Sequence, residues 1–223
     1  MRYHGTIVFD LDGTLVDTAP DLTASLNHAL AELGQPGVSP AAVRAMVGQG
    51  AYKLLEHATG DPALADAGLQ LFLDHYAAHI ADQSRPFPGV EAALDALAAA
   101  GCRLAVCTNK RQSMTDLLIE TLNWSGRFHA VVGADSVPNR KPDPGHVWAA
   151  VEAAGGRRDD AAFVGDSITD ARAAQAAGLP LVLVSFGYTD EPVAAMGAEA
   201  VIDHYDDLLP TLAGFKARSS TVA

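Results

Sequence analysis

Short apolar runs alternate along most of the chain with longer stretches whose apolar residues recur every three or four positions. The short runs predict buried strands at residues 6–9, 103–107, 130–133, 161–165, 181–185 and 200–202. The longer stretches predict helices at residues 89–100, 113–122, 144–154 and 169–177. Strands that alternate with helices in this way predict an α/β fold, a doubly wound parallel sheet with a Rossmann-like core.

One interval interrupts this alternation. Between residues 17 and 84 only helical patterns occur, at residues 20–33, 40–58 and 62–82, separated by segments rich in glycine and proline. An all-helical insertion of this length is large enough to form a small bundle of its own. We therefore expect a Rossmann-like core of residues 1–16 and 85–223, with an inserted α-helical cap domain of residues 17–84 over the edge of the sheet.

The composition is that of an ordinary globular protein. Of the 223 residues, 49% are hydrophobic and 19% are charged, and no apolar run approaches the length of a membrane span. Residues 1–5 lead into the first predicted strand without the apolar segment of a secretory signal. We therefore expect a cytoplasmic protein without a membrane partner, and the sequence leaves a monomer and a homodimer both open.

The net charge restricts the partners of the chain. A formal charge of −12 opposes binding to nucleic acid, which requires clustered lysine and arginine. An anionic small substrate would need a local positive focus, which a lysine, a helix N-terminus or a metal ion can supply.

Two residue pairs with metal or disulfide potential have plainer interpretations. Cys102 and Cys107 flank one predicted strand, and alternation places them on opposite faces, so we expect two small core residues. His75 and His79 have the i, i+4 spacing of helical metal ligands. No third ligand stands near them in the sequence, so we expect a solvated helix face.

Polar residues follow four of the predicted strands directly. Because the carboxyl ends of parallel strands meet at one edge of a sheet, we expect these side chains to converge on a crevice. Such a group of carboxylates, lysines and neutral donors suits a divalent metal ion and a phosphoryl group. The residues are Asp10, Asp12 and Gly13, then Thr108, Asn109 and Lys110, then Lys141, and finally Asp166 and Asp170.

The chemistry of phosphoryl transfer gives these residues distinct candidate roles. Asp10 and Asp12 are two positions apart on extended backbone, so their side chains lean the same way. One carboxylate could attack phosphorus while the other handles the proton of the leaving oxygen. Mg²⁺ would suit Asp10 and Asp166 as ligands, while Thr108 donates to phosphate oxygens and Lys141 offsets their charge.

Four motifs in this order resemble those of the haloacid dehalogenase superfamily of phosphohydrolases: "DLDGTLVD", "TNK", "RKPDP" and "GDSITD". The resemblance covers nearly the whole chain. Within the superfamily the sequence looks most like the phosphoglycolate phosphatases, whose helical cap also follows the first motif. It shares their "VGQGA" and "FGYTD" types of stretch, at residues 47–51 and 186–190.

The resemblance implies a role for each core residue. Asp10 would be the nucleophile that becomes an aspartyl phosphate. Asp12 would protonate the leaving alcohol and later activate water. Thr108 and Asn109 would hold the phosphoryl group, and Lys141 would steady both that group and the nucleophile.

The resemblance also implies a Mg²⁺ site. Asp166 would bind the ion together with Asp10 and the backbone carbonyl of Asp12, and Asp170 would order the water molecules around the metal. The implied activity is Mg²⁺-dependent hydrolysis of a small anionic phosphate monoester, with 2-phosphoglycolate favoured.

Residues of the predicted cap have two open interpretations each. The stretch Gly48-Gln49-Gly50 could form a nest of backbone amides that receives a carboxylate, or a plain loop between helices. Arg44 and Lys53 could anchor a second anionic end of the substrate, or form exposed salt bridges. Asp17 could act in catalysis, cap the first helix of the cap or form a hinge contact.

Other functions share parts of this pattern. Relatives with the same motifs cleave sugar phosphates, nucleotides or pyrophosphate, and a β-phosphoglucomutase-like enzyme would return the phosphoryl group to a sugar. A phosphonoacetaldehyde hydrolase would use a cap lysine such as Lys53, but that family lacks the second acid of the first motif, here Asp12. A module that only binds phosphorylated metabolites is the non-enzymatic alternative.

Overall fold

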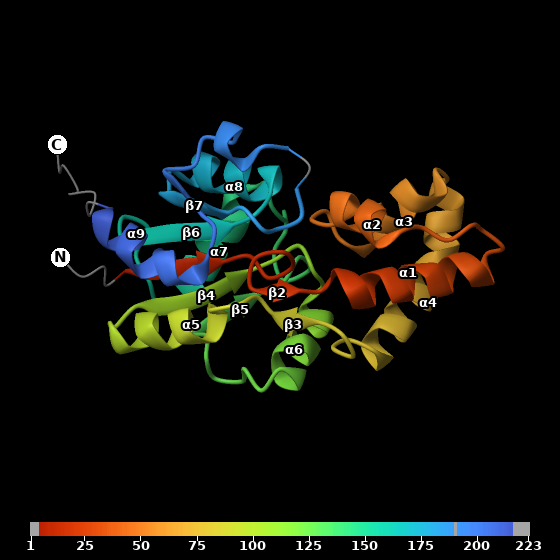
Figure 1. Cartoon of the computed structure of the whole chain (residues 1–223), viewed down its shortest axis with the longest axis horizontal. Coiled ribbons are helices and arrows are strands. Elements are labelled where there is room, and N and C mark those ends of the chain that lie inside the picture. Colours follow the sequence, from red (N-terminus) through yellow and green to blue (C-terminus); the bar gives the residue numbers. More distant parts are fainter. Residues whose placement is uncertain (1–4, 190, 216–223) are drawn as a thin grey trace.

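The computed structural model describes residues 5–189 and 191–215. Its larger part is built around a six-stranded parallel sheet (Figure 1). The order across the sheet is β5-β4-β1-β6-β7-β8. All six predicted strands are confirmed, and two of them end one residue earlier than expected. They are β1 (Thr6–Phe9), β4 (Arg103–Cys107), β5 (Ala130–Val132), β6 (Ala161–Gly165), β7 (Leu181–Val184) and β8 (Ala200–Ile202).

Helices cover both faces of the sheet because its strands are apolar on both sides. Ile7 and Phe9 of β1 belong to the apolar cluster on one face, and Val8 belongs to the cluster on the other. The first face is covered by α5 (Val90–Ala99), α6 (Gln112–Thr121) and α9 (Leu208–Gly214); the second is covered by α7 (Pro144–Ala153) and α8 (Ile168–Ala177).

The four helices predicted for the core are confirmed to within a residue or so at each end. Helix α9 and the short 3₁₀ turns η1 (Val193–Ala195) and η2 (Tyr205–Asp207) were not predicted. Cys102 and Cys107 lie in the clusters on opposite faces of the sheet, as predicted, and serve as small buried residues.

Four helices lie between two very short strands, β2 (Val16–Asp17) and β3 (Arg85–Pro86). We call residues 19–78 the helical insert, and Figure 1 shows it gathered at one end of the molecule, beside the sheet. Helix α1 runs along α4, and α3 packs against α4. The helices are α1 (Ala19–Glu32), α2 (Pro40–Met46), α3 (Ala51–Thr59) and α4 (Pro62–Ala78).

The insert differs from the sequence prediction at three places. The single helix expected over residues 40–58 is wrong, because Gly48 and Gly50 adopt φ values of +117° and +86° that break it into α2 and α3. Helix α4 ends at Ala78 rather than at residue 82. The antiparallel pair of β2 and β3, which joins the entry and the exit of the insert, was not predicted because two-residue strands carry no readable period.

Asp21 ties the entry of the insert to its exit. Its side chain lies in the first turn of α1 and the residue is only 1% exposed. The carboxylate accepts hydrogen bonds from the backbone N–H of Gln83 (3.0 and 3.1 Å) and from the N–H and hydroxyl of Ser84 (2.7 and 2.6 Å). This contact holds the two connecting segments together beside the β2–β3 pair.

Within residues 5–189 and 191–215, none of the helices has both the length and the apolar character that a membrane span requires. Residues 1–4, on which the expected absence of a signal segment partly rests, lie outside the described residues.

Replacing Asp21 with alanine should lower the free energy of unfolding by about 3 kcal/mol. The backbone N–H groups of Gln83 and Ser84 and the hydroxyl of Ser84 would all lose their acceptor. Urea unfolding followed by circular dichroism measures this change.

Asp95→Ala is the matched control, since Asp95 forms an exposed ion pair with Arg127 at 2.7 Å. Exposed pairs contribute about 0–1 kcal/mol, so this variant should unfold almost like the wild type. Similar small shifts in both variants would show that Asp21 does not tie the two segments together.

Candidate active site

Strand β1 delivers Asp10 to the carboxyl edge of the sheet. The backbone N–H of Asp10 donates to the carbonyl of Val164 in β6 at 2.9 Å, which fixes where the strand ends. The Asp10 carboxylate then accepts from the N–H of Leu11 at 2.7 Å. Gly13 turns the chain with φ +82°, and a Cβ there would lie 2.4 Å from a carboxylate oxygen of Asp166, so only glycine fits.

Lys141 lies between two of the carboxylates. Its Nζ is 2.9 Å from Oδ1 of Asp10 and 2.7 Å from Oδ1 of Asp170, and its side chain is 1% exposed. Asp170 is itself fixed at the start of α8, where its Oδ2 accepts from the N–H (3.1 Å) and the hydroxyl (2.7 Å) of Ser167. The lysine therefore links the loop before α7 to the end of β1 and to the first turn of α8.

Asp166 is held by partners from two other segments. The hydroxyl of Thr14 donates to its Oδ1 at 2.8 Å, and the backbone N–H of Tyr188 donates to its Oδ2 at 2.7 Å. One carboxylate oxygen from each of Asp10, Asp166 and Asp170 lies within 4.8 Å of the others, and all three residues are buried. Four residues were predicted to hold the metal, Asp12 among them through its backbone carbonyl. The structure brings the side chains of the other three together.

The charges in this cluster do not balance. Burial raises the pKa of Asp10 to about 7 against the opposing charge of Lys141, and the neighbouring Asp170 raises it further. Burial, followed by the charges of Asp170 and Asp10, raises the pKa of Asp166 well above its usual range. Burial alone would lower the pKa of Lys141, but the two carboxylates that it contacts raise it, so this residue stays an ammonium.

One ammonium cannot neutralise three buried carboxylates, and the raised pKa values of Asp10 and Asp166 express this imbalance. A divalent cation with a preference for oxygen ligands would neutralise that charge, so the donor set fits such an ion. The residues that would hold it come from the ends of β1 and β6 and from the first turn of α8.

Asp12 belongs to a second polar group, beside the first. Its Oδ1 accepts from the hydroxyl of Thr18 at 2.7 Å and pairs with Nζ of Lys110 at 2.9 Å. Nζ of Lys110 also lies 3.0 Å from the hydroxyl of Tyr76 in α4 of the insert, and 4.6 Å from the centre of that ring. Lys110 therefore connects Asp12 to the helical insert.

Sequence reasoning noted Lys110 after its strand but gave it no role, and it missed Tyr76. A tyrosine on the apolar stripe of a helix is a signal for such a contact, since a buried hydroxyl needs a partner. Tyr76 is 1% exposed, and burial raises its pKa to about 12, so the hydroxyl stays protonated.

Thr108 and Asn109 lie at the end of β4. The side-chain amide of Asn109 donates to the carbonyl of Gly48 in the insert at 2.9 Å and to the carbonyl of Lys141 at 3.0 Å. Its Oδ1 is buried and has no hydrogen-bond partner among the described residues. Asn109 is thus a second direct link between the core and the insert.

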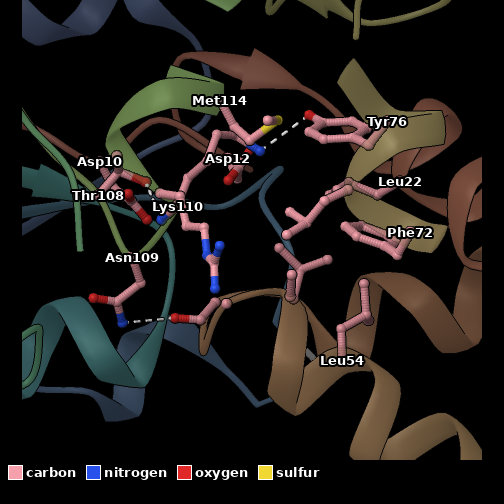
Figure 2. Close-up of a pocket in the computed structure, with 16 residues that line it drawn as sticks. Asp10, Asp12, Leu22, Leu54, Phe72, Tyr76, Thr108, Asn109, Lys110 and Met114 are labelled. Atoms are coloured by element: carbon pink, nitrogen blue, oxygen red, sulfur yellow. Dashed lines mark hydrogen bonds and ion pairs between the residues drawn. The ribbon is translucent and has the colours of Figure 1, made fainter. Parts of the chain in front are cut away.

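A pocket lies between these residues and the insert (Figure 2). Figure 2 shows Asp10, Asp12 and Asn109 on one side, with Leu54 and Phe72 of the insert across from them. The core contributes Asp10, Asp12, Thr108, Asn109, Lys110, Arg111 and Met114; the insert contributes Leu22, Val47, Gly48, Gly50, Ala51, Leu54, Phe72, Leu73 and Tyr76. The pocket therefore has a polar wall on the core side and a largely apolar wall on the insert side.

Some of the predicted cap residues line the pocket, and others lie near the β2–β3 pair, which we call the hinge because the chain enters and leaves the insert there. Gly48 and Gly50 line the pocket. Arg44 does not: its guanidinium pairs with Asp17 at 2.8 Å and lies 4.9 Å from the centre of the Tyr188 ring. Its role as a substrate anchor stays a prediction, as does that of Lys53, which pairs with Glu56 at the side of α3.

Asp17 lies at the hinge. Its carboxylate accepts a hydrogen bond from the hydroxyl of Tyr188 at 2.5 Å, in addition to its ion pair with Arg44. Its backbone lies opposite that of Arg85 in the antiparallel β2–β3 pair. The idea that Asp17 caps the first helix is wrong, since Thr18 occupies the position before α1. The hinge contact is the interpretation that the geometry supports.

Comparison with known proteins agrees with this geometry. The sequence profile of the haloacid dehalogenase-like hydrolases matches residues 7–184. A phosphoglycolate phosphatase of Caulobacter vibrioides is 51% identical over 209 residues, which cover 91% of this chain and 88% of the relative. One of Mesorhizobium japonicum is 47% identical over 213 residues, covering 93% and 94%.

Solved structures give the same result. The crystal structure of a predicted phosphoglycolate phosphatase from Haemophilus somnus superposes with a TM-score of 0.87 at 30% identity, covering 94% of this chain and 98% of that one. With its sequence profile, close relatives and fold in agreement, the chain belongs to the haloacid dehalogenase-like hydrolases and is a phosphoric monoester hydrolase of that family.

Proposed function

We propose that the enzyme hydrolyses 2-phosphoglycolate to glycolate and phosphate, with Mg²⁺ and through an aspartyl phosphate on Asp10. The observation that carries this proposal is the position of Asp10, on the polar wall of the pocket and 2.9 Å from the Lys141 ammonium. The names of the curated relatives favour phosphoglycolate as the substrate.

Asp10 is the proposed nucleophile. Its contacts with Lys141 and with the N–H of Leu11 both fall on Oδ1. They orient the carboxylate and leave Oδ2 as the oxygen that attacks phosphorus. As the new Oδ2–P bond forms, the bond from phosphorus to the ester oxygen of the substrate breaks.

Asp12 is the proposed acid and base. Lys110 and Thr18 engage its Oδ1, and Asp12 lines the pocket, so Oδ2 is the oxygen proposed to give its proton to the leaving alkoxide. In the second step the same oxygen takes a proton from water, which attacks phosphorus and releases the Asp10 carboxylate. A carboxylic acid and a carboxylate therefore alternate at one atom over the cycle.

The metal is proposed to be Mg²⁺, held by Asp10, Asp166 and the backbone carbonyl of Asp12, with Asp170 ordering its water molecules. When bound, it neutralises charge on the phosphoryl oxygens. The hydroxyl of Thr108 and the backbone N–H of Asn109 are proposed to donate to the same oxygens from the end of β4, since the Asn109 side-chain amide already donates to two carbonyls. Lys141 adds a fixed positive charge next to the nucleophile.

The helical insert and its connecting segments, residues 17–84 together, are proposed to act as a cap over the pocket. Its apolar wall would exclude water from the pocket while the aspartyl phosphate forms. The substrate carboxylate would meet the backbone amides around Gly48 and Gly50, where α3 begins. Lys110 and Arg111 line the same pocket and give this acidic protein the positive focus that an anionic substrate needs.

An assay of phosphate release from a panel of esters tests the activity. We expect Mg²⁺-dependent release with the highest kcat/KM for 2-phosphoglycolate, and a loss of roughly a thousandfold or more in Asp10→Asn, because an amide cannot attack phosphorus. The panel includes glucose 1-phosphate, a nucleotide and pyrophosphate.

The circular dichroism spectrum of Asp10→Asn, which should match the wild type, is the control for folding. Turnover that persists in this variant would rule out Asp10 as the nucleophile. A higher kcat/KM for a sugar phosphate would contradict phosphoglycolate as the substrate and favour a sugar phosphatase. Isomerised sugar with little free phosphate would favour a phosphomutase.

Tyr76→Phe tests the link between the insert and Asp12. Without the hydroxyl, Lys110 loses its bond to the insert and holds Asp12 less firmly. We expect kcat/KM for 2-phosphoglycolate, which reports the step that releases the alcohol, to fall by about tenfold. kcat/KM for p-nitrophenyl phosphate should change little, because its leaving group needs no proton.

Tyr52→Phe removes a hydroxyl from α3 of the same insert, at a residue that is not itself among those lining the pocket, and should leave both kcat/KM values unchanged. An equal loss on both substrates in Tyr76→Phe would mean that the hydroxyl supports the structure of the pocket and not proton transfer by Asp12.

A further inference from the structure

Three histidine rings lie together on the seam between α1 and α4. The ring centroids of His28, in α1, and His75, in α4, are 4.4 Å apart, and those of His75 and His79 are also 4.4 Å apart. The sequence showed only the i, i+4 pair without a third ligand. The packing of α1 along α4 supplies that third imidazole, and none of the three residues lines the active-site pocket.

Two of the rings are held by an oxygen at one nitrogen. Nδ1 of His79 is 2.8 Å from the carboxylate of Asp82, which can only accept, so Nδ1 carries the hydrogen. Nδ1 of His75 is 3.0 Å from the hydroxyl of the buried Ser25. Histidines that bind metals almost always have their second ring nitrogen fixed in this way, which leaves Nε2 to bind the ion.

We propose that His28, His75 and His79 form a binding site for a borderline transition-metal ion, Zn²⁺ in particular, separate from the carboxylate cluster of the active site. Imidazole nitrogen suits Zn²⁺, Ni²⁺ and Cu²⁺, whereas Mg²⁺ prefers oxygen, so the two sites would select different ions. Three imidazoles and a water molecule complete the four ligands that Zn²⁺ takes.

The rings are stacked in this structure, so they must turn before their nitrogens surround one ion. His28 and His79 are both exposed, so their rings can turn toward His75, which Ser25 holds in place. The side chain of Asp82 is itself 62% exposed and can follow the His79 ring. A bound ion would join the middle of α1 to the end of α4. The site would therefore brace the helical insert without touching the reacting groups.

Calorimetric titration with ZnCl₂ in the presence of excess MgCl₂ tests the site. We expect the wild type to bind Zn²⁺, and His28→Ala and His79→Ala each to weaken that binding by about tenfold or more, since loss of even an outer partner costs about 10–100-fold in affinity. His57→Ala, which removes an exposed histidine from α3, is the matched control and should bind like the wild type.

Zn²⁺ that enters the carboxylate cluster would bind equally to all four proteins and cancel from the comparison. Both substituted histidines are exposed, and unchanged phosphatase activity with Mg²⁺ confirms that the variants fold. Wild-type affinity in His28→Ala would overturn the three-histidine site, as would an equal loss in His57→Ala.

A Cu²⁺ electron paramagnetic resonance spectrum gives a second readout. We expect hyperfine coupling to more nitrogens in the wild type than in His28→Ala. Identical spectra for the two proteins would contradict coordination by His28.

Discussion

The active site depends on one electrostatic constraint: three buried carboxylates share a single buried ammonium. Isolated charges are costly to bury, and the ammonium of Lys141 pairs with Asp10 and Asp170. The carboxylate of Asp166 instead accepts hydrogen bonds from Thr14 and from the backbone of Tyr188. Gly13 leaves room for that carboxylate and for the Tyr188 ring, because a Cβ at this turn would collide with both. The strand ends, the turn and the start of α8 thus build a site whose remaining charge suits a cation.

The same region fixes where the helical insert sits. Asn109, next to the proposed phosphate donor Thr108, bonds the carbonyl of Gly48, and Lys110 bonds the hydroxyl of Tyr76. Both links begin in the segment that directly follows β4. The position of the insert and the orientation of the acidic groups are therefore linked through adjacent residues.

The sequence predicts where a residue lies in the site when that position follows from the local pattern and the order of the strands. Asp10 and Asp166 come directly after apolar strands, and parallel strands share an edge, so their convergence is a matter of topology. Contacts that depend on how helices pack are different. The partners of Tyr76 and His28 follow from the placement of α4 and α1, which periodicity does not give. The helix predicted over residues 40–58 continued through the break after α2 because both flanking segments have helical periodicity. The alternative interpretation of Gly48-Gln49-Gly50, a loop between helices, agrees with the two positive φ values that end α2.

The covalent state of Asp10 during turnover tests the proposed mechanism most directly. The enzyme is mixed with Mg²⁺ and p-nitrophenyl phosphate, quenched in acid within milliseconds, reduced with borohydride to mark an acyl phosphate, and digested for mass spectrometry. We expect the mark on Asp10, and more of it in Asp12→Asn, since that variant lacks the base that activates water. An unmarked Asp10 in both proteins during active turnover, or a mark on another residue, would contradict the mechanism.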